Sequence, residues 1–223
     1  KLNLKNNTTG GAYYKVDEEW DTFTKSDYAK FTFAWIDACK SVLKSNGSLY
    51  ISCTQHNIGE LTIAAKELGF ELKNILTWYK VNAMPNITKR TFTHSTEFVL
   101  WFVKGKNWIF NYDEVKKFNP NKTLKGEDKQ MRDFLDFIEL PIVQGKERLR
   151  GDDGRALHPT QKPVKLLELI ILASSNEGEI VLDPFFGSGT TGYVAQRFNR
   201  KWIGIETDKK YIKAAKERLK NVF

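Results

Sequence analysis

The chain has 223 residues, of which 41% are hydrophobic, so it is long and apolar enough to form one large α/β domain with a buried core. Its formal net charge is +8, and all of the excess lies after residue 79, because residues 1–79 carry nine basic and nine acidic side chains. Two cysteines and three scattered histidines argue against a disulfide framework or a metal cluster, and no apolar stretch approaches the length of a membrane span. The basic excess suits a partner that carries phosphates, and the composition predicts a cytoplasmic protein.

Helical and strand patterns alternate in the first half of the chain. Residues 1–19 are polar and predict a loop. The spacing of apolar residues then predicts a helix over 27–44, a strand over 48–53 and a helix over 58–68. The first helix has apolar residues at helical spacing, which predicts an inner face made of Phe31, Trp35, Cys39 and Leu43.

Two aromatic strands are predicted next, over residues 74–81 and 96–103, with a loop between them that is too long for a tight hairpin. We expect this pair to form an antiparallel edge of the sheet. From 104 to 155 the apolar pattern degrades, which predicts an inserted module or a mobile loop. Pro163 then suits the first turn of a helix over 164–174.

The chain is organised around the stretch 179–192. A short apolar strand ends on Asp183, and the turn after it carries Gly187, Gly189 and Gly192 at the spacing G-x-G-x-x-G before a helix over 190–198. A second strand, 201–206, ends on a carboxylate 19 residues after Gly187. In this context the glycine turn binds a nucleotide-like ligand, and the distant acid meets the hydroxyls of its ribose.

Only 17 residues follow Glu206, and they predict a single helix over 208–221. A dinucleotide fold would need several more strands after this point, so the rest of the sheet must come from upstream residues. Two other interpretations stay open here. One is a βαβ unit that binds no ligand. The other is a nicotinamide-dependent oxidoreductase, and the glycine spacing is the only feature of the sequence that supports it.

The residues at this turn resemble a known family. Asp183-Pro-Phe-Phe-Gly-Ser-Gly-Thr-Thr191 is similar to the S-adenosylmethionine motif of the DNA amino-methyltransferases, which methylate adenine N6 or cytosine N4. His158-Pro-Thr-Gln-Lys-Pro163 looks like the family's motif on the helix before the cofactor strand. The order of the two motifs resembles the permuted β class. The resemblance implies a Rossmann-like, circularly permuted α/β fold with a mixed seven-stranded sheet and an antiparallel edge hairpin, in a single domain over 1–223.

The resemblance also implies S-adenosylmethionine as the cofactor. Glu206 would meet the ribose hydroxyls, and Phe185 and Phe186 would wall the adenosine, although aromatic residues here also suit a core. Thr190 and Thr191 suit helix capping as well as ligand binding. The expected cofactor residues are His158, Thr160, Gln161, Lys162, Asp183, Pro184, Phe185, Phe186, Gly187, Ser188, Gly189, Thr190, Thr191 and Glu206.

The catalytic loop of the family, Asp-Pro-Pro-Tyr, does not occur in the sequence. By resemblance it would precede Trp20-Asp21, on a strand packed between 48–53 and 180–183, so we expect it upstream of Lys1. The sequence predicts a site-specific DNA methyltransferase that acts on a flipped base, with adenine N6 favoured over cytosine N4. A non-catalytic DNA-binding relative is the remaining alternative.

Double-stranded DNA is the partner that the resemblance implies, in a prokaryotic cell and beside the nucleoid, with a homodimer left open. In the family, the loop after Trp78-Tyr-Lys80 faces the flipped base and the phosphates. We therefore expect DNA contacts from Trp78, Lys80, Lys89 and Arg90, and we expect the module at 104–155 to recognise the target sequence.

Overall fold

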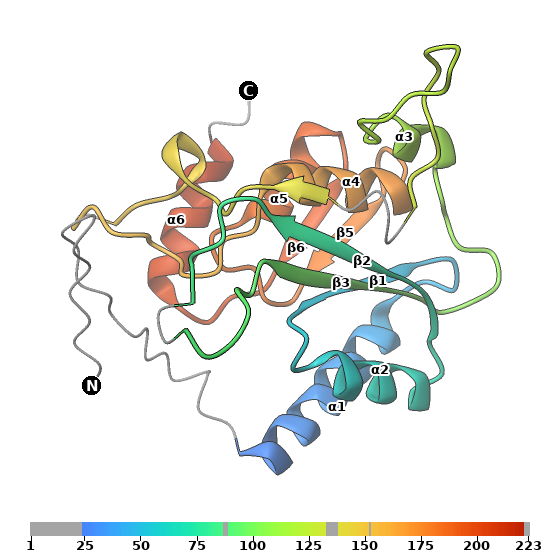
Figure 1. The fold of residues 1–223 in the computed structure, drawn as a ribbon. Helices are drawn as coiled ribbons and strands as arrows, with labels where there is room; N and C mark the ends of the chain where they lie inside the picture. The colour runs from blue at the N-terminus through green and yellow to red at the C-terminus, as the bar shows by residue number, and fades with distance from the viewer. Residues whose placement is uncertain (1–23, 87–88, 133–137, 152, 221–223) are drawn as a thin grey trace.

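The computed structural model describes residues 24–86, 89–132, 138–151 and 153–220 (Figure 1). The helices are α1 (Lys25–Val42), α2 (Ile58–Glu67), α3 (Tyr112–Lys116), α4 (Val164–Ser174), α5 (Thr190–Arg197) and α6 (Lys209–Lys220). The strands are β1 (Ser48–Cys53), β2 (Glu71–Lys80), β3 (Thr96–Val103), β4 (Ile138–Leu140), β5 (Ile180–Asp183) and β6 (Lys201–Gly204). The loop predicted over 1–19 lies outside the described residues.

The strands form two sheets rather than the single seven-stranded sheet that we predicted. One has the order β1-β3-β2-β4, and the other consists of β5 and β6 in parallel. Among the described residues no strand lies between β1 and β5. The β2–β3 hairpin is antiparallel as predicted, but it is not an edge, because β3 also pairs with β1 and β4 pairs in parallel with the end of β2.

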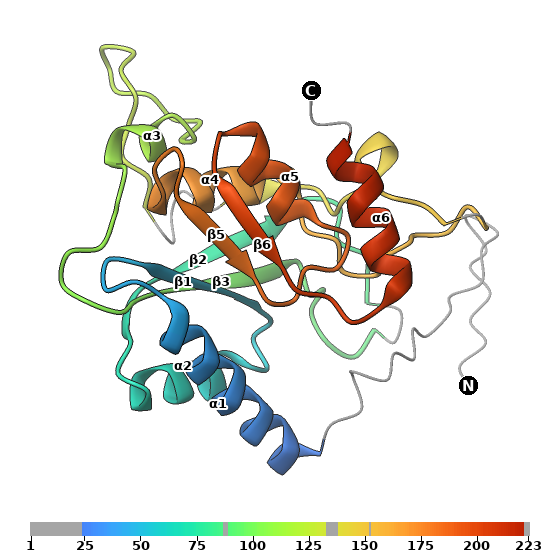
Figure 2. The ribbon, with the colours of Figure 1, turned by 180° about the vertical axis from the view of Figure 1, so that it is seen from behind.

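The two faces of the larger sheet are covered by different helices. On one face, α1 and α2 pack Ile36, Leu61 and Ala65 against the fully buried Phe102 of β3. On the other face, Leu166 of α4 packs against Val99 and Trp78. Figures 1 and 2 show this arrangement from opposite sides, with α1 and α2 below the sheet and α4, α5 and α6 above it.

Helix α1 is rotated relative to the face that we predicted. Its fully buried positions are Thr32 and Ile36, whereas Trp35 is half-buried and Phe31 is 39% exposed. The apolar residues of α1 therefore pack against two different parts of the molecule. Ile36 fills the core, while the rings of Phe31 and Trp35 turn toward the loop that follows β5.

Both cysteines are free thiols. Cys53 is buried in β1 and Cys39 is half-buried on α1. Burial raises the pKa of the Cys53 thiol to about 11, and burial together with the nearby charge of Asp183 raises the pKa of Cys39. Within the described part of the chain, no group of side chains could hold a metal ion, and no helix is long and apolar enough to cross a membrane.

The carboxyl ends of the strands determine where the glycine turn after β5 lies. Because β1 and β2 are both antiparallel to β3, their carboxyl ends lie on the same side of the sheet. The arrowheads of β5 and β6 point to that side as well in Figures 1 and 2. The loops after β2, β5 and β6 therefore gather at one end of the molecule, where open α/β sheets bind their ligands.

Candidate functional site

The glycine turn after β5 has the backbone that its sequence predicts. Gly187 and Gly189 have φ values of +50° and +75°, in the region that only glycine adopts readily. A Cβ atom on Gly187 would lie 2.8 Å from Nε2 of His158. Gly189 is the N-cap of α5, so the turn leads directly into a helix N-terminus.

Glu206 is held in front of this turn by backbone N–H groups. Its Oε2 atom accepts a hydrogen bond from the Gly187 N–H at 2.8 Å. Its Oε1 atom accepts from the N–H groups of Thr207 and Asp208 at 2.8 and 2.9 Å. The carboxylate after β6 is thus fixed beside the turn after β5, with lone pairs left to accept further hydrogen bonds.

Asp183 has a different role, because its side chain points into the protein interior and bonds to residues of the turn itself. Its carboxylate accepts from the Phe185 N–H at 3.0 Å and from the Thr191 hydroxyl at 2.6 Å. Burial raises the pKa of Asp183, and the nearby charge of Glu206 raises it further. Asp183 and Thr191 therefore hold the shape of the turn.

The two phenylalanines of the turn are in opposite environments. Phe186 is buried and stacks on Trp202 with ring centroids 5.3 Å apart, so it belongs to the core. Phe185 is 55% exposed and meets the rings of Trp35 and Phe31 of α1 edge-on, at 5.4 and 6.1 Å. Only Phe185 presents an aromatic surface outward from the turn.

The predicted segment 158–163 lies against the glycine turn. His158 packs on Tyr211 of α6, with ring centroids 4.6 Å apart, and its Nδ1 atom accepts from the Thr160 N–H at 3.2 Å. Gln161 is buried, and its amide bonds the Leu149 N–H and the Glu147 carbonyl. Gln161 therefore anchors the preceding loop, which the sequence did not predict.

Two further polar side chains of the turn are also turned inward. Ser188 and Thr190 are buried, and the Thr190 hydroxyl accepts from the Arg218 guanidinium at 2.8 Å. Burial lowers the pKa of Arg218. These residues offer a ligand their backbone N–H groups at the start of α5 rather than their side chains.

Glu97, at the start of β3, is a site residue that sequence reasoning missed. Its two carboxylate oxygens accept from Lys162 at 3.1 Å and from Lys80 at 3.5 Å. It thereby joins the segment before α4 to the end of β2. A lone carboxylate inside the aromatic strand 96–103 was the signal available in the sequence.

The predicted DNA-contacting residues do not all reach the surface. Trp78 is only 3% exposed, and its indole N–H donates to the Leu140 carbonyl at 2.9 Å, so it supports β4 instead of facing a partner. Lys89 and Arg90 are exposed on the loop after β2. Lys80 lies at the base of this loop, half-buried beside Glu97.

This geometry defines a class of protein. It is an α/β protein in which a glycine turn, a helix N-terminus and a fixed carboxylate meet at the carboxyl ends of parallel strands, which is the arrangement that binds a nucleoside-bearing cofactor.

Comparison with known proteins gives the family. The family model for N6/N4 DNA methylases matches residues 3–217. Type II methyltransferase M2.DpnII of Streptococcus pneumoniae is 41% identical over 95% of this chain and 75% of its own length, and M2.LlaDCHI of Lactococcus lactis subsp. cremoris is 40% identical with the same coverage. The chain belongs to this family of DNA methylases, and it is a site-specific DNA methyltransferase that uses S-adenosylmethionine.

Solved structures agree with this assignment. The M1.HpyAVI–SAM complex is 34% identical, with a TM-score of 0.68 over 86% of this chain and 84% of that one. The cytosine-N4-specific PvuII DNA methyltransferase has a TM-score of 0.69 over 92% of this chain and 74% of that one, but at 22% identity it shows only the shared fold.

The residues at the turn fit this cofactor. A ribose needs a hydroxyl acceptor, and the Glu206 carboxylate is already oriented by three backbone N–H groups. An adenine ring needs an apolar surface, and Phe185 offers one. When bound, the cofactor supplies a sulfonium-activated methyl group as the electrophile.

Proposed function

We propose that the enzyme methylates adenine N6 within a fixed DNA sequence, with the cofactor at the Glu206-clamped glycine turn. The main observation behind this proposal is the hydrogen bond that fixes the Glu206 carboxylate beside the glycine turn. Cytosine N4 is the other amine that this family modifies. The neighbour that is specific for cytosine N4 is only 22% identical, about half the identity of the Type II relatives.

We assign the cofactor residues by what their positions allow. Glu206 accepts from the ribose hydroxyls, Phe185 lies beside the adenine, and the N-terminus of α5 at Thr190 faces the rest of the ligand. Lys162 and Thr160 lie on the adjoining segment and bind its carboxylate. The chain order, with the cofactor half last, supports the permuted β-class arrangement.

We further assign DNA binding to the loop after β2. Lys89 and Arg90 contact phosphates, and residues 104–155 read the target sequence from base edges. The target base must leave the duplex before its amine can reach the methyl group, at a cost of a few kcal/mol. With the cofactor bound, its sulfonium would supply the methyl group to the amine nitrogen and become a thioether, and the proton that the nitrogen releases would pass to water. The similarity to Type II methyltransferases supports a link to a restriction-modification system, and DNA as the substrate supports a place beside the nucleoid.

Nucleoside analysis tests the proposal. The purified enzyme is incubated with plasmid DNA and S-adenosylmethionine, and the DNA is digested and analysed by mass spectrometry. We expect N6-methyladenine at one sequence context. N4-methylcytosine would overturn the choice of base, and an absence of both products would overturn the proposed activity.

A further inference from the structure

One aromatic side chain on the loop after β2 is almost completely exposed. Phe92 is 96% exposed, although the other phenylalanines with large exposed fractions, such as Phe185 and Phe31, still meet neighbouring rings. Exposing a whole phenylalanine ring to water is unfavourable by about 1.5–3 kcal/mol relative to burying it. A single exposed apolar side chain is ordinary on a protein surface, so the position of Phe92 gains its meaning from the residues around it.

The surroundings of Phe92 suit nucleic acid. Residues 81–96 contain two basic and no acidic side chains, and both basic residues, Lys89 and Arg90, are exposed. Met84, on the same loop, is 54% exposed. An apolar tip beside cationic side chains offers contact to bases and to phosphates at once.

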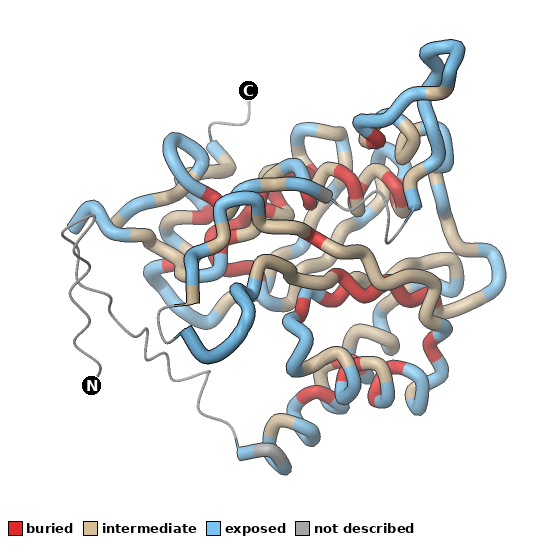
Figure 3. The backbone as a smooth tube through the Cα atoms, viewed as in Figure 1, coloured by how far each residue is buried: buried red, intermediate tan, exposed pale blue. Residues whose placement is uncertain are grey.

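The base of this loop is fixed while its tip projects. The Lys80 N–H donates to the Ser95 carbonyl at 2.7 Å, and Gln55 bonds Nδ1 of His94 at 2.8 Å. At the tip, Asn86 bonds the Thr91 hydroxyl, and Lys89 has a positive φ of 54°, a strained conformation for a residue other than glycine. Figure 3 shows residues 89–94 as an exposed stretch near the left-hand ends of β2 and β3.

We propose that Phe92 inserts into the DNA base stack and occupies the space that the target base leaves when it flips out. This rests on the proposed function, because it takes duplex DNA as the substrate bound at this end. Apolar wedges between base steps are a general means of stabilising unstacked DNA. Hydrogen bonds hold the base of the loop, and stacking of the inserted ring offsets part of the stacking that is lost when the base leaves.

The test compares substrates that differ in how firmly the target base is held. Phe92→Ala and Phe92→Trp are assayed in the full chain on a paired duplex, on the same duplex with a mismatch at the target base, and on the single strand. We expect Phe92→Ala to lower kcat/KM about ten- to a hundredfold on the paired duplex, the range for losing one aromatic stacking partner. On the mismatch and the single strand, where stacking is already weakened, we expect less than about a threefold loss, with Phe92→Trp close to wild type.

Controls separate this role from weaker binding and from the proposed function. Ile63→Ala removes another exposed apolar side chain, on α2, and should change none of the rates. An equal loss on all three substrates would show that Phe92 is only a binding platform, and no loss on the duplex would also overturn the proposal. Failure of the wild type to methylate any duplex would instead overturn the proposed function, and the wedge with it.

Discussion

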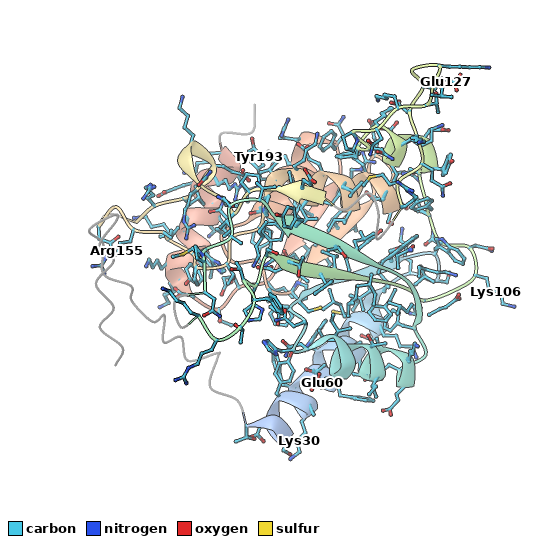
Figure 4. The ribbon with its side chains drawn as sticks, viewed as in Figure 1. Lys30, Glu60, Lys106, Glu127, Arg155 and Tyr193 are labelled. Carbon is cyan, nitrogen blue, oxygen red and sulfur yellow. The ribbon has the colours of Figure 1, made fainter. Side chains whose placement is uncertain are left out.

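At the scale of single residues, the proposed position of the cofactor depends mainly on Glu206. Glu206→Ala should weaken S-adenosylmethionine binding by about 1–3 kcal/mol, because a charged hydrogen-bond acceptor for the ribose is lost. Calorimetry measures the affinity directly. Glu60→Ala is the matched control, since Glu60 is an exposed carboxylate on α2, across the sheet from Tyr193 of α5 (Figure 4). Unchanged affinity in Glu206→Ala would contradict the ribose assignment.

Gly187 tests the shape of the turn separately from its charge. Gly187→Ala places a side chain at a φ of +50° and 2.8 Å from the His158 ring, so we expect a stability loss of more than about 1 kcal/mol and weaker cofactor binding. Gly59→Ala on α2 is the opposite case, because nothing lies within 4 Å of the new Cβ atom. There we expect a gain of up to about 1 kcal/mol from helix propensity. Chemical denaturation of both variants measures the two effects, and equal stability changes would refute the strain at Gly187.

At the scale of elements, the loop after β2 is expected to hold the DNA backbone. Lys89→Ala combined with Arg90→Ala should weaken binding to all DNA sequences and reduce the salt slope of log K by about two, one for each lost phosphate contact. Fluorescence anisotropy over a range of salt concentrations measures this slope. The pair Lys44→Ala with Lys66→Ala, at exposed positions on the other side of the sheet, should leave it unchanged. If both double variants keep the wild-type slope, the loop is not at the DNA.

The elements also show how far the sequence could be read. Strands β1 and β3 and helix α4 have the predicted bounds, because long apolar runs between clear breaks depend little on distant residues. The three residues of β4 could not be found, since they form a strand only by pairing with the end of β2. That pairing also explains why the predicted edge hairpin lies inside the sheet.

The same distinction holds for the site. The glycine turn and Glu206 were predictable because local spacing sets them. The burial of Trp78 and the anchoring of Gln161 were not, because each depends on a backbone group at least twelve residues away, the carbonyl of Leu140 for Trp78 and the N–H of Leu149 for Gln161. Glu97 was missed for the same reason, since both of its lysine partners are distant in sequence.

At the scale of the whole molecule, Glu97 links the two halves of the chain. Its bonds to Lys162 and Lys80 join the segment before α4 to the strand that precedes the loop after β2. Glu97→Gln should cost about 1–3 kcal/mol of stability, because it leaves two partly buried ammonium groups without their anion. It should also weaken binding of both cofactor and DNA.

Denaturant unfolding and the two binding assays measure these effects. Glu71→Gln provides the comparison, because Glu71 pairs with Lys73 with a side chain that is 65% exposed, and such surface pairs contribute about 0–1 kcal/mol. If the two variants behave alike, the Glu97 pairs are only surface contacts.

The two free thiols have a practical consequence. Alkylating reagents attack the thiolate, and the raised pKa values of Cys39 and Cys53 keep both side chains protonated near neutral pH. These are the only two cysteines in the sequence. We therefore expect a third cysteine introduced at an exposed position to be modified by a maleimide dye faster than Cys39 and Cys53.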